Sequence, residues 1–123
     1  MARILVIDDD PTIRSLVSGL LEARGHTVIV ARDGRIGMEI FSAGNVDLVI
    51  TDIVMPEQEG IATIGSIRRL SSTIPILAIS GSNTVGRYGD YLHVAEELGA
   101  NAGLKKPLDP DRLIETIDRL IGL

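Results

Sequence analysis

Short aliphatic runs alternate along the chain with longer segments in which apolar residues recur every three or four positions. The short runs predict buried strands, and the longer spacing predicts helices with one buried face. The expected strands span residues 4–7, 27–30, 46–51, 76–79 and 102–104. The expected helices span residues 11–24, 36–43, 61–70, 91–98 and a last segment that follows Asp109. Because strands and helices alternate, this order predicts an α/β domain whose parallel sheet is covered on both faces.

Composition narrows the class of protein. A length of 123 residues predicts one domain. Hydrophobic residues make up 45% of the chain but aromatic ones only 2%, so the core of this domain is expected to be aliphatic. The chain has no cysteine, which excludes disulfides and thiolate metal sites. Its net charge of -5 argues against nucleic acid as a partner. No apolar stretch is long enough for a signal peptide or a membrane span, so we expect a cytoplasmic domain without membrane insertion.

Polar residues lie at the carboxyl ends of most of the expected strands. They are Asp8-Asp9-Asp10, Asp52, Ser80 and Lys106. Open α/β sheets bind ligands at the carboxyl ends of their strands, so these side chains are expected to meet. Adjacent carboxylates suit a hard cation such as Mg²⁺, and a carboxylate, a hydroxyl and an ammonium suit phosphoryl transfer. Asp10 is set apart, because Asp10-Pro11 is typical of a helix N-cap followed by proline at the first helical position.

The order of these residues carries a resemblance to a known family. The matching pieces are Ile4 to Pro11, Asp52 with Met55-Pro56 and Gly60, Ser80, and Lys106-Pro107. Together they cover the whole chain and resemble a response-regulator receiver domain of two-component signalling, of the single-domain kind that acts in chemotaxis. The resemblance implies a flavodoxin-like, doubly wound sheet of five parallel strands with helices on both faces. It also implies one receiver domain over residues 1–123, with no effector domain.

The resemblance implies a role for each residue of the phosphoryl-transfer set. Asp52 would be the phosphoacceptor, Ser80 would hydrogen-bond the phosphoryl oxygens, and Lys106 would pair with them. The Lys106-Pro107 peptide bond is commonly cis in this family. The domain would assist only its own phosphorylation and dephosphorylation, so it is not expected to be an enzyme.

The cofactor implied by the resemblance is Mg²⁺. Asp9 would bind it directly and Asp8 largely through water. Asp52 and the backbone carbonyl of Val54 would complete the protein ligands.

The resemblance also implies partners. The phosphoryl donor would be the phosphohistidine of a sensor histidine kinase or of a histidine phosphotransfer protein. The output would be a changed contact with a downstream protein, or onward relay of the phosphoryl group. We expect a monomer or a weak homodimer, with no nucleic-acid partner, and such systems are typical of bacteria.

Two features depart from the family pattern. Many receivers carry Tyr or Phe three residues before the lysine, where this chain has Gly103. Residues 81–90 are rich in Gly, Ser and Asn and predict a longer loop than usual. Our hypothesis is that this loop provides the readout when Ser80 moves.

Two other functions remain open from the sequence. Asp8-x-Asp10-x-Thr12 also matches the nucleophile motif of haloacid-dehalogenase-type phosphatases, in which Asp8 would be the nucleophile and Asp10 the general acid-base. That interpretation leaves Asp52 unexplained. The other alternative is a receiver that binds partners without being phosphorylated, which Gly103 keeps open. His26 and His93 have no pattern for metal or catalysis, and we expect both at the surface.

Overall fold

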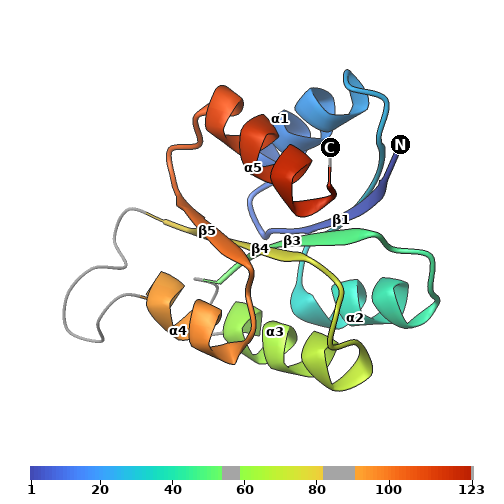
Figure 1. The fold of residues 1–123 in the computed structure, drawn as a ribbon, viewed down its shortest axis with the longest axis vertical. Coiled ribbons are helices and arrows are strands. Elements are labelled where there is room, and N and C mark those ends of the chain that lie inside the picture. Colours follow the sequence, from blue (N-terminus) through green and yellow to red (C-terminus); the bar gives the residue numbers. More distant parts are fainter. Residues whose placement is uncertain (54–58, 82–90, 123) are drawn as a thin grey trace.

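The computed structural model describes residues 1–53, 59–81 and 91–122. The strands are β1 (Arg3–Ile7), β2 (Thr27–Ala31), β3 (Leu48–Asp52), β4 (Ile76–Ser80) and β5 (Ala102–Lys105). The helices are α1 (Pro11–Glu22), α2 (Gly34–Ser42), α3 (Glu59–Leu70), α4 (Tyr91–Leu98) and α5 (Pro110–Leu120). They form one parallel sheet in the order β2-β1-β3-β4-β5, with α1 and α5 on one face and α2, α3 and α4 on the other (Figure 1). The predicted flavodoxin-like, doubly wound fold is therefore confirmed.

Each face of the sheet has its own aliphatic core, and the alternation along β1 supplies both. Ile4 and Val6 join the cluster beneath α1 and α5, which includes Val17 and Leu113. Leu5 and Ile7 join the opposite cluster, beneath α2, α3 and α4. Successive side chains of a strand point to opposite faces, so a continuous apolar run is required when both faces are covered.

Aspartate side chains begin three of the helices. Asp10, Asp33 and Asp109 each accept a hydrogen bond from a backbone amide in the first helical turn. The prediction for Asp10 is confirmed, since its Oδ1 lies 2.9 Å from the amide nitrogen of Thr12. The cap at Asp33 starts α2 at Gly34, two residues before the predicted start, because its Oδ1 accepts the amide of Ile36.

Other boundaries differ from the prediction by one or two residues. Helix α1 ends at Glu22 rather than at residue 24, and Gly25 follows with a φ of 87°. Strand β3 begins at Leu48 rather than at residue 46, and it includes Asp52. The apolar spacing continues past the last backbone hydrogen bond of a helix or strand. It therefore predicts where an element lies better than it predicts where the element begins and ends.

The expectation that His26 lies at the surface was wrong. His26 is 7% exposed, and its Nδ1 accepts the backbone amide of Ala2 at 3.1 Å. His26 directly precedes β2, which pairs with β1. This pairing brings the N-terminal residues that precede β1 next to His26. His93 is exposed as predicted, and its Nε2 lies 3.0 Å from Glu97.

The sheet order places a topological switch between β1 and β3. The chain leaves β1 for β2 on one side and then crosses back to β3 on the other. Ligands of open α/β sheets bind outside the carboxyl ends of the strands at such a point.

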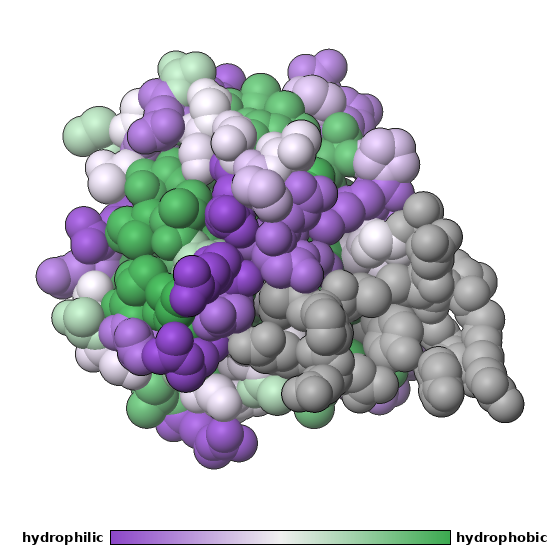
Figure 2. Space-filling model, turned by 180° about the vertical axis from the view of Figure 1, so that it is seen from behind, coloured by the Kyte–Doolittle hydropathy of each residue, from purple (hydrophilic) through white to green (hydrophobic). Residues whose placement is uncertain are grey.

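Figure 2 shows apolar areas bordered by polar ones, and the exposed apolar side chains include Leu16 and Val30. Scattered apolar residues at a surface are normal. None of the helices described is both long enough and apolar enough to pass through a bilayer.

Two helix glycines provide a test of this packing. A Cβ at Gly37 of α2 would lie 2.5 Å from Cδ1 of the fully buried Ile7, whereas a Cβ at Gly19 of α1 would have nothing within 4 Å. We expect Gly37→Ala to lower the free energy of unfolding by about 1–3 kcal/mol through overpacking. Gly19→Ala should raise it by up to about 1 kcal/mol through helix propensity. Urea denaturation of both variants measures this, and equal effects would contradict the packing of α2 on β1.

Candidate functional site

The polar residues that follow the strands gather at one edge of the sheet. Asp8 and Asp9 follow β1, Asp52 and Ser80 are the last residues of β3 and β4, and Lys106 follows β5. Parallel pairing puts these positions next to one another, with Ile7 opposite Thr51, Asp52 opposite Ile79, and Ser80 opposite Lys105. The backbone amide of Lys106 also donates to the carbonyl of Ser80 at 2.7 Å, which extends the β4–β5 ladder to the lysine.

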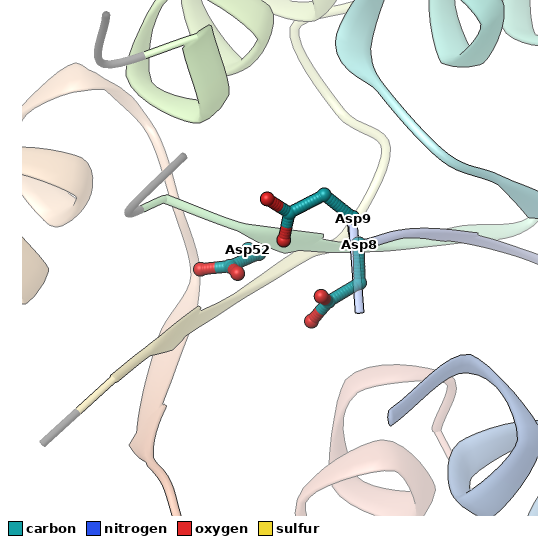
Figure 3. A group of neighbouring side chains, drawn as sticks. All are labelled: Asp8, Asp9 and Asp52. Atoms are coloured by element: carbon teal, nitrogen blue, oxygen red, sulfur yellow. The ribbon is translucent and has the colours of Figure 1, made fainter. Parts of the chain in front are cut away.

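Asp8, Asp9 and Asp52 form a compact carboxylate cluster. One oxygen from each lies within 4.8 Å of the other two, and the three side chains converge between the ends of β1 and β3 (Figure 3). Asp8 and Asp52 are 1% and 3% exposed, whereas Asp9 is exposed. Exposed acidic residues often cluster without any ion. Two buried carboxylates are different, because burying like charges together is costly unless a cation compensates them.

Lys106 supplies one such cation. Its Nζ lies 3.1 Å from Oδ2 of Asp8 and 3.1 Å from Oδ2 of Asp52, and its side chain is 19% exposed. Burial acts to lower the pKa of Lys106, but the charge of Asp52, the hydrogen bond to Asp52 and the charge of Asp8 outweigh it, and the net pKa is raised. The ammonium is therefore charged at every physiological pH. Lys105, its neighbour, is exposed.

Asp8 has an unusual environment for a carboxylate. Oδ1 accepts the backbone amide of Asp10 at 2.8 Å, whereas the fully buried Oδ2 has no aligned hydrogen bond within the described ranges. Oδ2 of Asp8 and the ammonium of Lys106 form a close ion pair, but the two groups are not aligned for a hydrogen bond. Burial raises the pKa of Asp8, the amide of Asp10 lowers it, the charge of Asp52 raises it and Lys106 lowers it; the net pKa is raised.

These features fit a divalent cation. A buried carboxylate oxygen without a hydrogen bond is a ready ligand, and the cluster adds two further carboxylates within ligand distance of a shared point. An all-oxygen set with room for water suits Mg²⁺ rather than a softer metal. Asp8, Asp9 and Asp52 could therefore hold Mg²⁺. The other predicted ligand, the carbonyl of Val54, lies outside the described residues.

Ser80 and the residues around it are placed in part. Ser80 is fully buried at the end of β4, and its hydroxyl donates to the carbonyl of Gly81 at 3.2 Å. The hypothesis that the loop at residues 81–90 provides the readout concerns residues 82–90, which lie outside the described residues. The Lys106-Pro107 bond is cis, as the resemblance implied.

Gly103 lies on β5 where α4 packs against the strand. A Cβ there would lie 2.9 Å from Cδ2 of Leu92, so an L side chain would displace α4 or Leu92. Leu92 is buried and belongs to the core beneath α4. In this chain α4 therefore rests directly on the backbone of β5.

Two residues contribute to the site in ways that the sequence did not reveal. A Cβ at Gly60, in the first turn of α3, would overlap the backbone carbonyl oxygen of Asp52, so only glycine permits this approach. Arg14, in the first turn of α1, donates from Nη1 to the backbone carbonyl of Asp8 at 2.7 Å. One signal for Arg14 was available: a cation in the first turn opposes the helix dipole and needs another reason to be there.

Comparison with known proteins decides the family. The model of the response regulator receiver domain matches residues 4–118. The chain belongs to the response-regulator receiver family. Receivers are phosphoacceptor signalling domains of two-component systems, so the coarse functional class follows from membership.

Individual relatives agree with this assignment. The chain is 32% identical over 121 residues to the transcriptional regulatory protein CpxR of Escherichia coli K12, and this alignment covers 98% of the chain and 50% of CpxR. It is 36% identical over 119 residues to ZraR of Salmonella typhimurium, covering 97% of this chain and 26% of that protein. The chain thus spans half or less of the length of these relatives.

Solved structures support the fold in the same way. A receiver domain protein from Clostridium thermocellum aligns with a TM-score of 0.88 at 31% identity, covering 99% of this chain and 95% of that one. The chemotaxis protein CheY4 of Vibrio cholerae aligns with a TM-score of 0.86 at 30% identity, covering 98% of each chain.

The raised pKa of Asp8 predicts how pH affects the metal-free receiver. An acid whose pKa is raised by folding takes up its proton more readily in the folded state, so its contribution to stability falls as pH rises above the ordinary value of 3.8 and through the raised one. Asp8→Asn removes this charge and keeps an oxygen for the amide of Asp10. In EDTA the variant should be more stable than wild type at about pH 7, by a margin that shrinks toward about pH 4.

Urea denaturation across this pH range measures the margin. Asp10→Asn is the matched control, because it removes a neighbouring exposed charge and keeps a side chain that caps α1. If wild type were as stable as Asp8→Asn at neutral pH, the buried charge of Asp8 would carry no cost.

Proposed function

We propose that this receiver accepts a phosphoryl group on Asp52 from the phosphohistidine of a partner protein, with Mg²⁺ held by Asp8, Asp9 and Asp52. One observation carries the proposal: a nearly buried carboxylate at the end of β3 lies beside two carboxylates of the β1 edge and within 3.1 Å of a lysine ammonium. A nucleophile, a cation site and a mobile positive charge are what phosphoryl transfer from an amine donor requires.

The transfer is a single displacement at phosphorus. An oxygen of Asp52 forms the new P–O bond while the P–N bond to the donor imidazole breaks, and the departing imidazole nitrogen keeps the electron pair. Mg²⁺, when bound, would offset negative charge on the phosphoryl oxygens. Lys106 would offset charge on the same oxygens from the β5 side, where its backbone is tied to Ser80. The hydroxyl of Ser80 would donate to a phosphoryl oxygen once it leaves the carbonyl of Gly81.

Partners follow from the same chemistry. The donor would be a histidine kinase or a histidine phosphotransfer protein, and the matched relatives are named as transcriptional regulatory proteins. Added phosphoryl charge at the sheet edge would favour a different arrangement of the surrounding loops and so alter a contact with a downstream protein. The expectation of no nucleic-acid partner is not supported, because it rested on the charge of a segment that spans half or less of these regulators.

The geometry weighs against the phosphatase alternative. In that alternative Asp10 would be the general acid-base, but its carboxylate caps α1 by accepting the amide of Thr12. Asp8 would be the nucleophile, yet its Oδ1 is held by the amide of Asp10 at 2.8 Å. This alternative also leaves Asp52 unused, although Asp52 accepts a hydrogen bond from Lys106 at 3.1 Å.

Intact-protein mass measures the proposed reaction. Incubation with acetyl phosphate and Mg²⁺ should add one phosphoryl group to the wild type, and EDTA or Asp52→Asn should abolish the adduct. Loss of the adduct in Asp8→Asn but not in Asp52→Asn, with turnover of acetyl phosphate, would favour the phosphatase. Absence of any adduct, with acetyl phosphate and with a phosphorylated histidine kinase, would favour a receiver that binds its partners without phosphorylation.

Lys106 and a divalent cation compete for the same two carboxylates. Lys106→Met should therefore tighten Mg²⁺ binding, by about tenfold if the ion pairs contribute ~1.4 kcal/mol against the metal. The same substitution should slow phosphorylation by about 10²-fold or more, because one charge that stabilises the transferring group is lost. Calorimetric titration and the rate of adduct formation measure the two effects. Lys105→Met removes the neighbouring exposed charge as a control, and weaker Mg²⁺ binding by Lys106→Met would contradict the competition.

A further inference from the structure

Arg14 reaches back from α1 to the loop that carries the acidic residues. Its Nη1 donates to the backbone carbonyl of Asp8 at 2.7 Å, a short distance typical of a charge-assisted bond. The side chain is half-buried and lies beside a small surface hollow of about 210 Å³ that also includes Pro11 and Val30. The contact joins the first turn of the helix to the end of β1, on either side of Asp9 and Asp10.

This contact fixes the peptide that leads into Asp9. The carbonyl of Asp8 and the amide of Asp9 belong to one planar unit, so holding the carbonyl also sets the direction in which the chain enters Asp9. The preceding peptide is held separately, since the amide of Asp8 donates to the carbonyl of Ala31 at 3.1 Å. Beyond Asp9 two hydrogen bonds hold the loop: the backbone amide of Asp10 donates to the Asp8 carboxylate, and the amide of Thr12 donates to the Asp10 carboxylate.

Asp9 depends on its backbone more than the other two carboxylates do. Asp8 is held through Oδ1 by the amide of Asp10, and Asp52 is paired with Lys106. The carboxylate of Asp9 is exposed, and no hydrogen bond or ion pair holds it within residues 1–53, 59–81 and 91–122. It nevertheless points toward Asp52 within ligand distance of the cluster (Figure 3). Its place is therefore set by the peptide that Arg14 holds.

Arg14 also brings a positive charge to a helix start, which is unfavourable for α1. The acidic triplet offsets this cost, but the charge itself would oppose a second cation nearby. The two effects of Arg14 on metal binding therefore have opposite signs. Electrostatic repulsion predicts tighter binding when the arginine is removed, whereas loss of the held peptide predicts weaker binding.

We propose that Arg14 is a positioning residue for the cation site: its bond to the carbonyl of Asp8 orients the Asp8–Asp9 peptide so that Asp9 can join Asp8 and Asp52 around one ion. The inference rests on the proposed Mg²⁺ site and adds a residue that touches neither the ion nor the phosphoryl group. Orientation outweighs repulsion, so removal of Arg14 weakens cation binding although it removes a positive charge.

Binding of Mn²⁺ to the full chain, followed by electron paramagnetic resonance of the free ion, tests this directly. Mn²⁺ takes the same oxygen ligands as Mg²⁺. Arg14→Met should bind Mn²⁺ about tenfold more weakly than wild type, the scale seen when a partner that orients metal ligands is lost. Arg24→Met is the matched control, because it removes the same charge just beyond the other end of α1, where Arg24 pairs with Asp118. Its Mn²⁺ affinity should equal that of wild type.

A second measurement separates positioning from a general loss of structure. In the mass assay with acetyl phosphate, Arg14→Met should need a higher Mg²⁺ concentration for half-maximal adduct, with the same maximal extent at saturating Mg²⁺. Circular dichroism checks the fold of each variant. If Arg14→Met does not fold, Arg14→Lys replaces it, since it keeps the charge and loses the planar fork; binding weaker than wild type is then expected.

Several outcomes would overturn the inference. Arg14→Met that binds Mn²⁺ as tightly as wild type, or more tightly, shows that repulsion outweighs positioning. Equal weakening in Arg24→Met shows that the effect is not specific to the bond between Arg14 and the carbonyl of Asp8. If wild type forms the Mg²⁺-dependent adduct and Arg14→Met matches it at every Mg²⁺ concentration, the inference alone fails. If wild type binds no Mn²⁺ and forms no adduct, the proposed function fails with it.

Discussion

The candidate site depends on one interaction, the contact of the Lys106 ammonium with the carboxylates of Asp8 and Asp52. Two nearly buried carboxylates at one edge would destabilise the domain unless a cation compensated them. Lys106 lies 3.1 Å from both and does so from β5, two strands away from β3. The compensation is incomplete, because Oδ2 of Asp8 has no aligned hydrogen bond in the described part of the chain. A site that remains short of positive charge is suited to take up a cation.

The rest of the fold places these charges with little freedom. Central strands buried on both faces set the positions of Asp8, Asp52 and Ser80, because each follows or ends such a strand. Gly60 brings α3 against the backbone of Asp52 at a distance that any side chain would prevent. The edge is therefore built mainly from backbone pairing and close packing, and its polar side chains inherit their places from that framework.

The sequence predicted most of the fold because its signals are local. Apolar runs and aspartate–proline caps located every strand and helix within a few residues, and strand ends identified the candidate site residues. The prediction for His26 failed, since its burial depends on pairing between β1 and β2 and on the amide of Ala2, 24 positions away. Sequence reasoning also missed Arg14, because its acceptor is a backbone carbonyl, which every residue has.

The sequence by itself determined which chemistry is possible: carboxylates, a hydroxyl and a lysine at the carboxyl ends of strands, in the order of a receiver. It did so because secondary structure and residue type are properties of short segments. Tertiary structure alone decided the distances, since the register of parallel strands brings together residues as far apart as Asp8 and Lys106. It also decided the charge balance, because burial and the neighbours of each carboxylate, rather than residue type, set which cation compensates it.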